Sequence, residues 1–188
     1  MTKSTIKIPS GKQLINTKDL LEKIGLEEKM RVADLGCGRR GYFSLQAAKI
    51  VGNKGLIIAV DVVKEALENV KSAAKLFGIT NLETIWADLE ILGATKIPSD
   101  SMDMVMLNNI LFQSNQEEKI INEAARILKK QGKLLVTDWK KIKTPFGPPT
   151  KDRVEPERVK NYAQNSGLIL EQELEAGPYH YALVFKKT

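Results

Sequence analysis

Apolar residues recur along this chain in two patterns, as short continuous runs and as longer stretches with helical spacing. The continuous runs are typical of buried strands and predict them over residues 31–35, 56–60, 82–87, 102–107 and 134–139. Apolar positions three and four residues apart predict amphipathic helices over residues 17–24, 42–51, 63–77, 116–130 and 155–166. Because glycine favours helix ends, we expect three of these helices to end at Gly78, Gly132 and Gly167.

The alternation of these elements predicts the architecture. Five strands separated by helices favour right-handed crossovers and a mostly parallel sheet that is covered on both faces. Two more apolar runs, residues 168–174 and 181–186, are joined only by a short turn, so they must pair as antiparallel neighbours. We therefore expect an α/β fold with a doubly wound, mostly parallel seven-stranded sheet that carries an antiparallel C-terminal hairpin strand.

The length of 188 residues fits one domain. We expect residues 1–188 to form it, with an N-terminal helical segment over residues 1–29 and the sheet and its helices over residues 30–188. The first residues lack the apolar core of an export signal, and no run approaches the roughly 20 apolar residues that cross a bilayer. These features favour a cytoplasmic protein without a membrane span, which we expect to be a monomer or a homodimer.

The composition excludes several kinds of chemistry. Cys37 is the only cysteine and His180 the only histidine, so an intramolecular disulfide, a cysteine cluster and a histidine cage are all excluded, and no metal site is expected. The chain has 29 lysines and arginines against 23 aspartates and glutamates, a net charge of +6. This excess favours an anionic partner, although lysines at helix ends and at the chain end are more typical of a solvated surface.

A glycine-rich stretch, VADLGCGRRGYF, follows the first predicted strand. Gly36, Gly38 and Gly41 match the G-x-G-x-x-G pattern that holds the pyrophosphate of a dinucleotide. A pyrophosphate needs backbone N–H groups and a helix N-terminus without an anion beside them. Asp34 lies two residues before the first glycine, where its carboxylate repels a diphosphate and attracts an ammonium group. A dinucleotide remains the alternative ligand for this loop.

Three aspartates stand at or near the carboxyl ends of the first three predicted strands, at equal intervals. Asp61 lies 27 residues after Asp34, and Asp88 lies 27 residues after Asp61, close to the length of one βαβ unit. This spacing places all three carboxylates at the sheet edge where ligands of such folds bind, although any one of them alone also fits an ordinary strand-end role. A carboxylate in the position of Asp61 accepts hydrogen bonds from ribose hydroxyls. A ligand that combines a ribose with a positively charged amino acid satisfies the whole arrangement, and S-adenosylmethionine is such a ligand.

The segments VADLGCG, LIIAVD, WADLE, MDMVMLNN and ARILKKQGKLLVTDW resemble the class I S-adenosylmethionine-dependent methyltransferases, including the group related to ubiquinone and menaquinone biosynthesis methyltransferases. The resemblance covers nearly the entire chain after about Leu26. It implies a Rossmann-like methyltransferase domain with S-adenosylmethionine as cofactor. The cofactor-binding residues that it implies are Asp34, Leu35, Gly36, Cys37, Gly38, Tyr42, Asp61, Val62, Asp88, Leu89 and Asn108.

Within this resemblance, Asp61 binds the cofactor ribose, Asp88 contacts the adenine amino group with Leu89 packed nearby, and Asn108 lines the site after the fourth strand. The chain departs from the family at Arg39-Arg40, where the usual loop has one residue between its second and third glycines. We expect at least one of these arginines to face solvent, the cofactor carboxylate or an anionic substrate.

Methyl transfer from a sulfonium is an in-line displacement, so the protein mainly aligns the acceptor and excludes water. No catalytic residue is obligatory. Where the acceptor needs a general base, the candidates are His180, Asp138 and Tyr179, and the candidates for acceptor contacts are Trp139, Tyr181 and Asn109. A packing role is the alternative for each. The Pro-rich stretch of residues 140–152 is either a lid or a rigid connection.

The acceptor class follows mainly by exclusion. Asn108-Asn109-Ile110-Leu111 replaces the Asn-Pro-Pro-Tyr type of motif that methylation of adenine amino groups requires in related enzymes, and the familiar form of arsenite methylation uses several cysteines. A small-molecule acceptor is therefore our first hypothesis. RNA or protein as acceptor is the second, and a non-catalytic or nicotinamide-dinucleotide-binding protein is the third.

Overall fold

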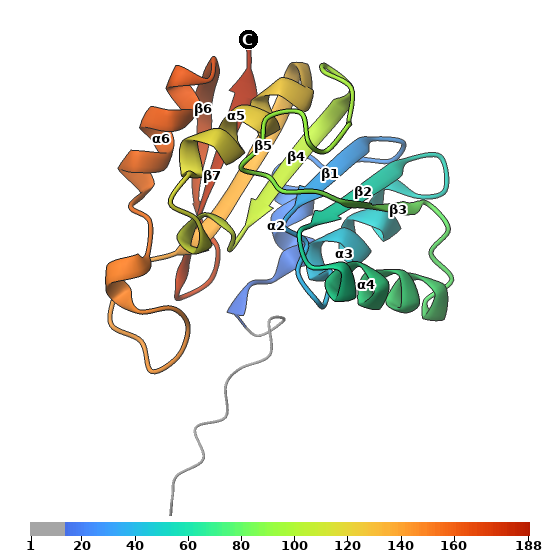
Figure 1. Cartoon of the computed structure of the whole chain (residues 1–188), viewed down its shortest axis with the longest axis horizontal. Coiled ribbons are helices and arrows are strands. Elements are labelled where there is room, and N and C mark those ends of the chain that lie inside the picture. The colour runs from blue at the N-terminus through green and yellow to red at the C-terminus, as the bar shows by residue number, and fades with distance from the viewer. Residues whose placement is uncertain (1–13) are drawn as a thin grey trace, which may run out of the picture.

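The computed structural model describes residues 14–188, so residues 1–13 of the predicted N-terminal segment lie outside the described residues. A seven-stranded sheet runs through the molecule in the order β3-β2-β1-β4-β5-β7-β6 (Figure 1). Its strands are β1 Arg31–Leu35, β2 Leu56–Asp61, β3 Leu82–Trp86, β4 Met102–Asn108, β5 Leu128–Trp139, β6 Leu168–Glu175 and β7 His180–Lys187. Neighbours from β3 to β5 are parallel, and β7 lies antiparallel between β5 and β6. The predicted fold class is confirmed.

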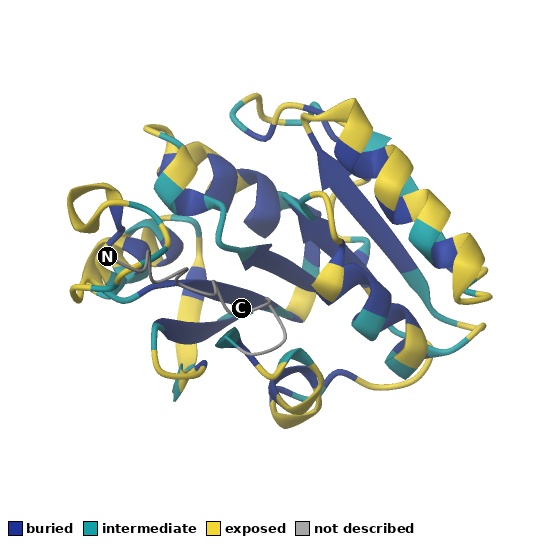
Figure 2. Cartoon of the chain, turned by 90° about the horizontal axis from the view of Figure 1, so that it is seen from below, coloured by how far each residue is buried: buried dark blue, intermediate teal, exposed yellow. Residues whose placement is uncertain are grey.

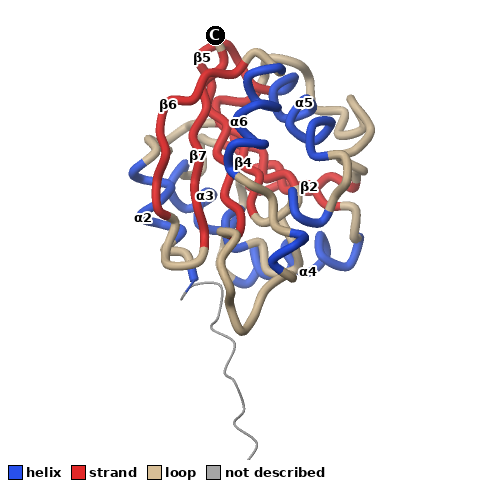
Figure 3. The backbone as a smooth tube through the Cα atoms, turned by 90° about the vertical axis from the view of Figure 1, so that its left-hand side faces the viewer, coloured by secondary structure: helices blue, strands red, loops and turns tan. Residues whose placement is uncertain are grey.

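Helices cover both faces of the sheet, as Figure 3 shows. They are α2 Thr17–Lys23, α3 Tyr42–Val51, α4 Lys64–Leu76, α5 Glu117–Ile127 and α6 Pro156–Asn165, with short 3₁₀ turns η1 Leu111–Gln113 and η2 Thr150–Asp152. One apolar core joins the sheet to α5 and α6, and a second joins the other face to α2 and α3. The central strands are buried, whereas the edge strands β3 and β6 are partly exposed and the outer helix faces are exposed (Figure 2). Residues 14–188 contain no helix that is both long and apolar enough to span a bilayer.

The predicted end of one helix was wrong. The helix expected over residues 116–130 ends at Ile127, and β5 begins at the next residue. Leu128 pairs with Met102, and the ladder then continues after a bulge. Gly132 lies in this bulge, where an added Cβ would be 2.9 Å from the Lys129 carbonyl oxygen. Gly132 therefore allows the close approach of backbone atoms in the bulge, and the helix has already ended before it.

Two glycines of the loop after β1 allow close approaches that shape the ligand-binding edge of the sheet. Gly36 has a φ of +81°, and an added Cβ would meet the Ile110 side chain at 2.8 Å. Gly41 precedes α3 with a φ of +53°, and an added Cβ would lie 2.7 Å from Val70 of α4. The loop can therefore lie between the β4 loop and α4 only because these positions lack side chains.

Candidate active site

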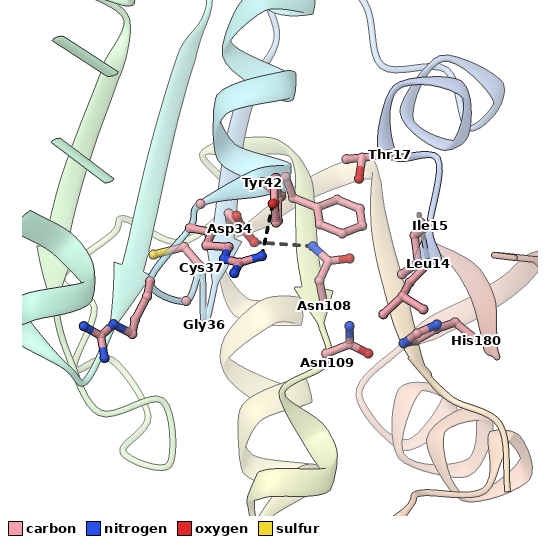
Figure 4. Close-up of a pocket in the computed structure, with 15 residues that line it drawn as sticks. Leu14, Ile15, Thr17, Asp34, Gly36, Cys37, Tyr42, Asn108, Asn109 and His180 are labelled. Atoms are coloured by element: carbon pink, nitrogen blue, oxygen red, sulfur yellow. Dashed lines mark hydrogen bonds between the residues drawn. The ribbon is translucent and has the colours of Figure 1, made fainter. Parts of the chain in front are cut away.

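Two neighbouring pockets lie at the carboxyl ends of the parallel strands, and Gly36 lines both. The first, which we call the loop pocket, has a volume of about 250 Å³ (Figure 4). Its lining includes the predicted residues Asp34, Gly36, Cys37, Gly38, Tyr42, Asn108, Asn109 and His180. The second, which we call the Asp61 pocket, has a volume of about 170 Å³. Its lining includes Asp61, Val62, Asp88 and Leu89. The chain thus brings twelve predicted residues into two adjoining cavities.

Asp34 is a buried carboxyl group that ties three elements together. It accepts hydrogen bonds from Ser44 Oγ of α3 at 2.5 Å and from Asn108 Nδ2 of β4 at 3.4 Å; Figure 4 draws the second of these. Burial raises its pKa to about 6, against the effect of both hydrogen bonds. The group therefore remains mainly ionised at neutral pH and gives the loop pocket a negative charge.

Asp61 fixes the glycine loop to the end of β2. Its Oδ2 accepts from the Gly38 N–H and its Oδ1 from the Val63 N–H, both at 2.9 Å. Each carboxylate oxygen can accept a further hydrogen bond, so the side chain remains able to bind hydroxyl groups in the Asp61 pocket. Asp88 is exposed and accepts from the Glu90 N–H at 2.9 Å. The three evenly spaced aspartates therefore lie at one edge of the sheet but line two pockets, Asp34 the loop pocket and the other two the Asp61 pocket.

Arg39 and Arg40, between the second and third glycines of the loop, lie at the exposed rim of the loop pocket. Arg39 forms an ion pair with Glu65 at 2.6 Å. The guanidinium of Arg40 lies 5.8 Å from the centre of the Tyr42 ring and donates to its hydroxyl at 3.3 Å. Both side chains face solvent, which was one of the three orientations expected from the sequence. Cys37 lies beside them, and burial together with the charges of Asp34 and Asp61 raises the pKa of its thiol, which disfavours a nucleophilic role.

His180 is the first residue of β7 and is completely buried. It pairs with Trp139 in the ladder, and its ring centre lies 4.2 Å from that of the indole. Burial and the positive charges of Arg153 and Lys140 lower its pKa to about 4, so the imidazole is neutral at pH 7. Neither ring nitrogen has a hydrogen-bond partner among residues 14–188, and the same holds for Asn109 Oδ1 in the same pocket.

The remaining predicted residues line neither of these two pockets. Leu35 is completely buried in the core. Asp138 is buried, accepts from the Trp139 N–H at 2.7 Å and has its pKa raised to about 7 by burial. Tyr181 points to a different cavity, donates to the Val154 carbonyl at 3.2 Å and also has its pKa raised by burial. Tyr179 and Trp139 pack against Phe146.

Sequence reasoning missed several lining residues. Leu14, Ile15 and Thr17 precede or begin α2 and line the loop pocket, together with Phe43 of α3. Nothing in the sequence indicates this, because the chain before α2 reaches the pocket only through tertiary packing. The Asp61 pocket also includes Ile110, Gln113 and Ser114 from the β4 loop and η1. Ile110 of this segment lies against Gly36. As a bulky residue directly after Asn109, Ile110 was a weak sequence signal that this segment belongs to the site.

A family model described as a methyltransferase domain matches residues 26–177 of the chain. The chain belongs to the class I S-adenosylmethionine-dependent methyltransferases. This assignment confirms the predicted family and cofactor class. A solved S-adenosylmethionine-dependent methyltransferase from Aquifex aeolicus superposes with a TM-score of 0.87 over 96% of this chain and 94% of that one, at 24% identity. At this identity the similarity shows a shared fold.

Two curated relatives are similar to part of the methyltransferase domain. A probable cobalt-precorrin-6B C(15)-methyltransferase from Methanosarcina mazei is 36% identical over 107 residues, 56% of either chain. A ubiquinone/menaquinone biosynthesis C-methyltransferase from Vibrio vulnificus is 30% identical over 118 residues, 62% of this chain and 44% of the relative. The chain thus spans about half the length of the curated relatives it matches.

Proposed function

We propose that this methyltransferase transfers the methyl group of S-adenosylmethionine to a small-molecule acceptor. The observation that carries the proposal is the pair of pockets that adjoin at Gly36. One pocket presents a carboxylate suited to ribose hydroxyls. The other presents a buried negative charge and continues to unpartnered polar groups. In this arrangement the Asp61 pocket would take the nucleoside, and the loop pocket would take the charged amino acid and the acceptor.

The Asp61 pocket is the proposed site of the adenosine. Asp61 would accept from the ribose hydroxyls, Asp88 would contact the adenine amino group, and Val62 and Leu89 would pack against the nucleoside. A hydrogen bond to a charged group contributes about 1.5–3 kcal/mol. The carboxylate of Asp61 is already held by the Gly38 and Val63 N–H groups, so little further ordering is needed when the ligand arrives.

The loop pocket is the proposed site of the methionine part. Gly36, Gly38 and Tyr42 surround it, and Asp34 with its partner Asn108 supplies the negative charge. A carboxylate here attracts the ammonium and sulfonium groups and repels a diphosphate. When bound, the cofactor supplies a methyl group on a positively charged sulfur. The chain itself orients the reactants and excludes water.

The size of the loop pocket favours a small molecule. It has a volume of about 250 Å³ and is bordered by the segment before α2. The two curated relatives are named for precorrin and quinone biosynthesis, which supports an acceptor of metabolite size. The net charge of +6 favours the alternative, an RNA acceptor. Of the candidates for acceptor contacts, Asn109 lines this pocket. The general-base candidate His180 also lines it, and Trp139 packs against His180.

Isothermal calorimetry with S-adenosylmethionine, S-adenosylhomocysteine and NAD tests the proposal. We expect both sulfur nucleosides to bind and NAD to give no heat. Asp61→Ala should weaken binding about ten- to a hundredfold through the loss of one or two charge-assisted hydrogen bonds. Glu83→Gln is the matched control, since Glu83 is exposed on the neighbouring strand β3. Binding of NAD in place of the nucleosides would overturn the proposal, and unchanged affinity would remove Asp61 from the site.

A further inference from the structure

Unpartnered polar atoms are concentrated at one part of the loop pocket. Among the described residues, four buried side-chain atoms lack a hydrogen-bond partner, and three of them belong to His180 and Asn109. Both side chains line the loop pocket, on the side away from Cys37 in Figure 4. A buried polar atom without a partner costs about 1–3 kcal/mol. A ligand that supplies these hydrogen bonds would recover that cost.

The imidazole of His180 packs against Trp139. The two ring centres lie 4.2 Å apart with their planes tilted by 46°, and the Arg153 guanidinium lies over the Trp139 ring at 5.1 Å. His180 is fully buried and forms no hydrogen bond within residues 14–188. The ring thus lines the pocket with neither nitrogen engaged in a hydrogen bond within residues 14–188.

The charges around this part of the pocket select the kind of polar group. A neutral imidazole offers one donor and one acceptor, and Asn109 Oδ1 offers an acceptor. Asp34 lines the same pocket together with Arg39 and Arg40. Arg153 and Lys140 add positive charge near His180, which disfavours an ammonium group there. A hydroxyl or N–H group can donate to the two acceptors, whereas a carboxylate or phosphate has no hydrogen to donate. An uncharged donor group therefore matches the available partners.

Apolar residues border the same pocket and indicate the body of the ligand. Ile15, before α2, is 4% exposed and Phe43 of α3 is 8% exposed. We propose that Asn109, His180, Ile15 and Phe43 form the acceptor subsite, which takes an uncharged molecule bearing a hydroxyl or N–H group on an apolar or aromatic body. This inference rests on the proposed function, because the rest of the loop pocket is assigned there to the cofactor.

Three probes of similar shape test this chemistry. p-Cresol carries a hydroxyl donor, 4-methylanisole has the same ring without a donor, and 4-methylbenzoate is an anion. The protein is first saturated with S-adenosylhomocysteine. Each probe is then titrated while the ring-proton NMR signal of His180, the only histidine of the chain, is followed. We expect p-cresol to shift this signal saturably and each of the other two to bind about tenfold more weakly, as expected from the loss of one hydrogen bond to a buried partner.

His180→Phe keeps an aromatic ring at this position and removes both nitrogens. We expect it to weaken p-cresol binding, measured by line broadening of the probe, about tenfold, and calorimetry with S-adenosylhomocysteine checks that the variant is folded. Should the variant not fold, the titration of the unaltered protein still decides. An unmoved His180 signal, or equal binding of all three probes, overturns the subsite. Absence of S-adenosylhomocysteine binding would instead overturn the proposed function, and the subsite with it.

Discussion

The protonation of His180 can be measured directly because the chain has a single imidazole. Burial and the nearby charges of Arg153 and Lys140 lower its pKa to about 4 from an ordinary 6.5. We therefore expect the ring-proton signal, followed by NMR in protein free of any histidine tag, to titrate with a midpoint near pH 4. A midpoint near 6.5 would mean that the ring is hydrated and would contradict its burial.

The same shift predicts how stability depends on pH. The unfolded chain takes up the His180 proton near pH 6.5 and the folded chain only near pH 4, so stability is lost as pH falls through this window. The full loss is roughly 3 kcal/mol. Asp34 and Asp138, whose folded pKa values are raised to about 6 and about 7, act in the opposite direction.

Urea unfolding of the native chain and His180→Phe separates these effects, because both proteins keep the two carboxyl groups. We expect the stability difference between them to move in favour of the variant by roughly 2–3 kcal/mol as the pH falls from about 7 to about 4. A difference that stays constant across this range would show that His180 titrates normally in the folded state.

At the scale of elements, two glycines of one loop offer a matched comparison. Gly38 and Gly41 both have positive φ, of +65° and +53°, but an added Cβ at Gly38 meets nothing within 4 Å, whereas one at Gly41 meets Val70 at 2.7 Å. We expect Gly38→Ala to cost about 1–2 kcal/mol for the left-handed backbone. Gly41→Ala should cost a further 1–3 kcal/mol, by order of magnitude, for the clash between α3 and α4.

Denaturant unfolding of both variants measures the two costs. Val70→Ala removes the side chain that an alanine at position 41 would meet, so the clash should be smaller in the double variant Gly41→Ala with Val70→Ala. Equal destabilisation by Gly38→Ala and Gly41→Ala, without rescue, would show that the helices move apart at no cost.

The Pro-rich stretch after β5 is held by one arginine. Arg153 is 4% exposed and donates to the carbonyl oxygens of Lys140 at 2.9 Å and Ile142 at 2.7 Å. It also donates to the Pro148 carbonyl at 2.9 Å and to Thr144 Oγ1 at 2.5 Å. One buried guanidinium thus holds several oxygens of this segment, which favours a connection over a lid.

Removal of the Arg153 guanidinium should release this segment. We expect trypsin to cleave Arg153→Gln after Lys140, Lys141 or Lys143 at least about tenfold faster than the native chain, because cleavage follows the population of the open segment. Arg31→Gln is the control, since Arg31 is exposed at the start of β1. Mass spectrometry locates the cuts. Equal cleavage of both variants would mean that other contacts hold the segment.

Across the whole molecule, the sequence predicted features that repeat and missed features set by long-range packing. The aspartate spacing predicted one sheet edge because each βαβ unit has a similar length. The start of β5 at Leu128 was missed because its local pattern suits a helix, and pairing with Met102 decides otherwise. His180 lines the loop pocket and Tyr181 another cavity because neighbouring strand residues point to opposite faces. Which of these two residues lines the loop pocket depends on the strand register, which is known only from the fold.

Within residues 14–188, the positive charge is not gathered at the loop pocket. Several lysines are paired at separate places on the molecule, Lys129 with Asp103, Lys133 with Glu171 and Lys187 with Asp100. Among the described residues of the loop pocket, the arginines are Arg39 and Arg40, and Arg39 is paired with Glu65. A continuous basic face beside the pocket is what an RNA acceptor would require.

We therefore expect only non-specific binding of RNA. Fluorescence anisotropy with a labelled RNA of about 20 nucleotides should show affinity that falls more than about tenfold between about 50 and 200 mM salt, because released counterions supply the binding energy. S-adenosylhomocysteine should leave this affinity unchanged, since the cofactor pockets contribute nothing to it. Tight binding that persists at the higher salt and responds to S-adenosylhomocysteine would place RNA at the pocket and replace the small molecule as acceptor.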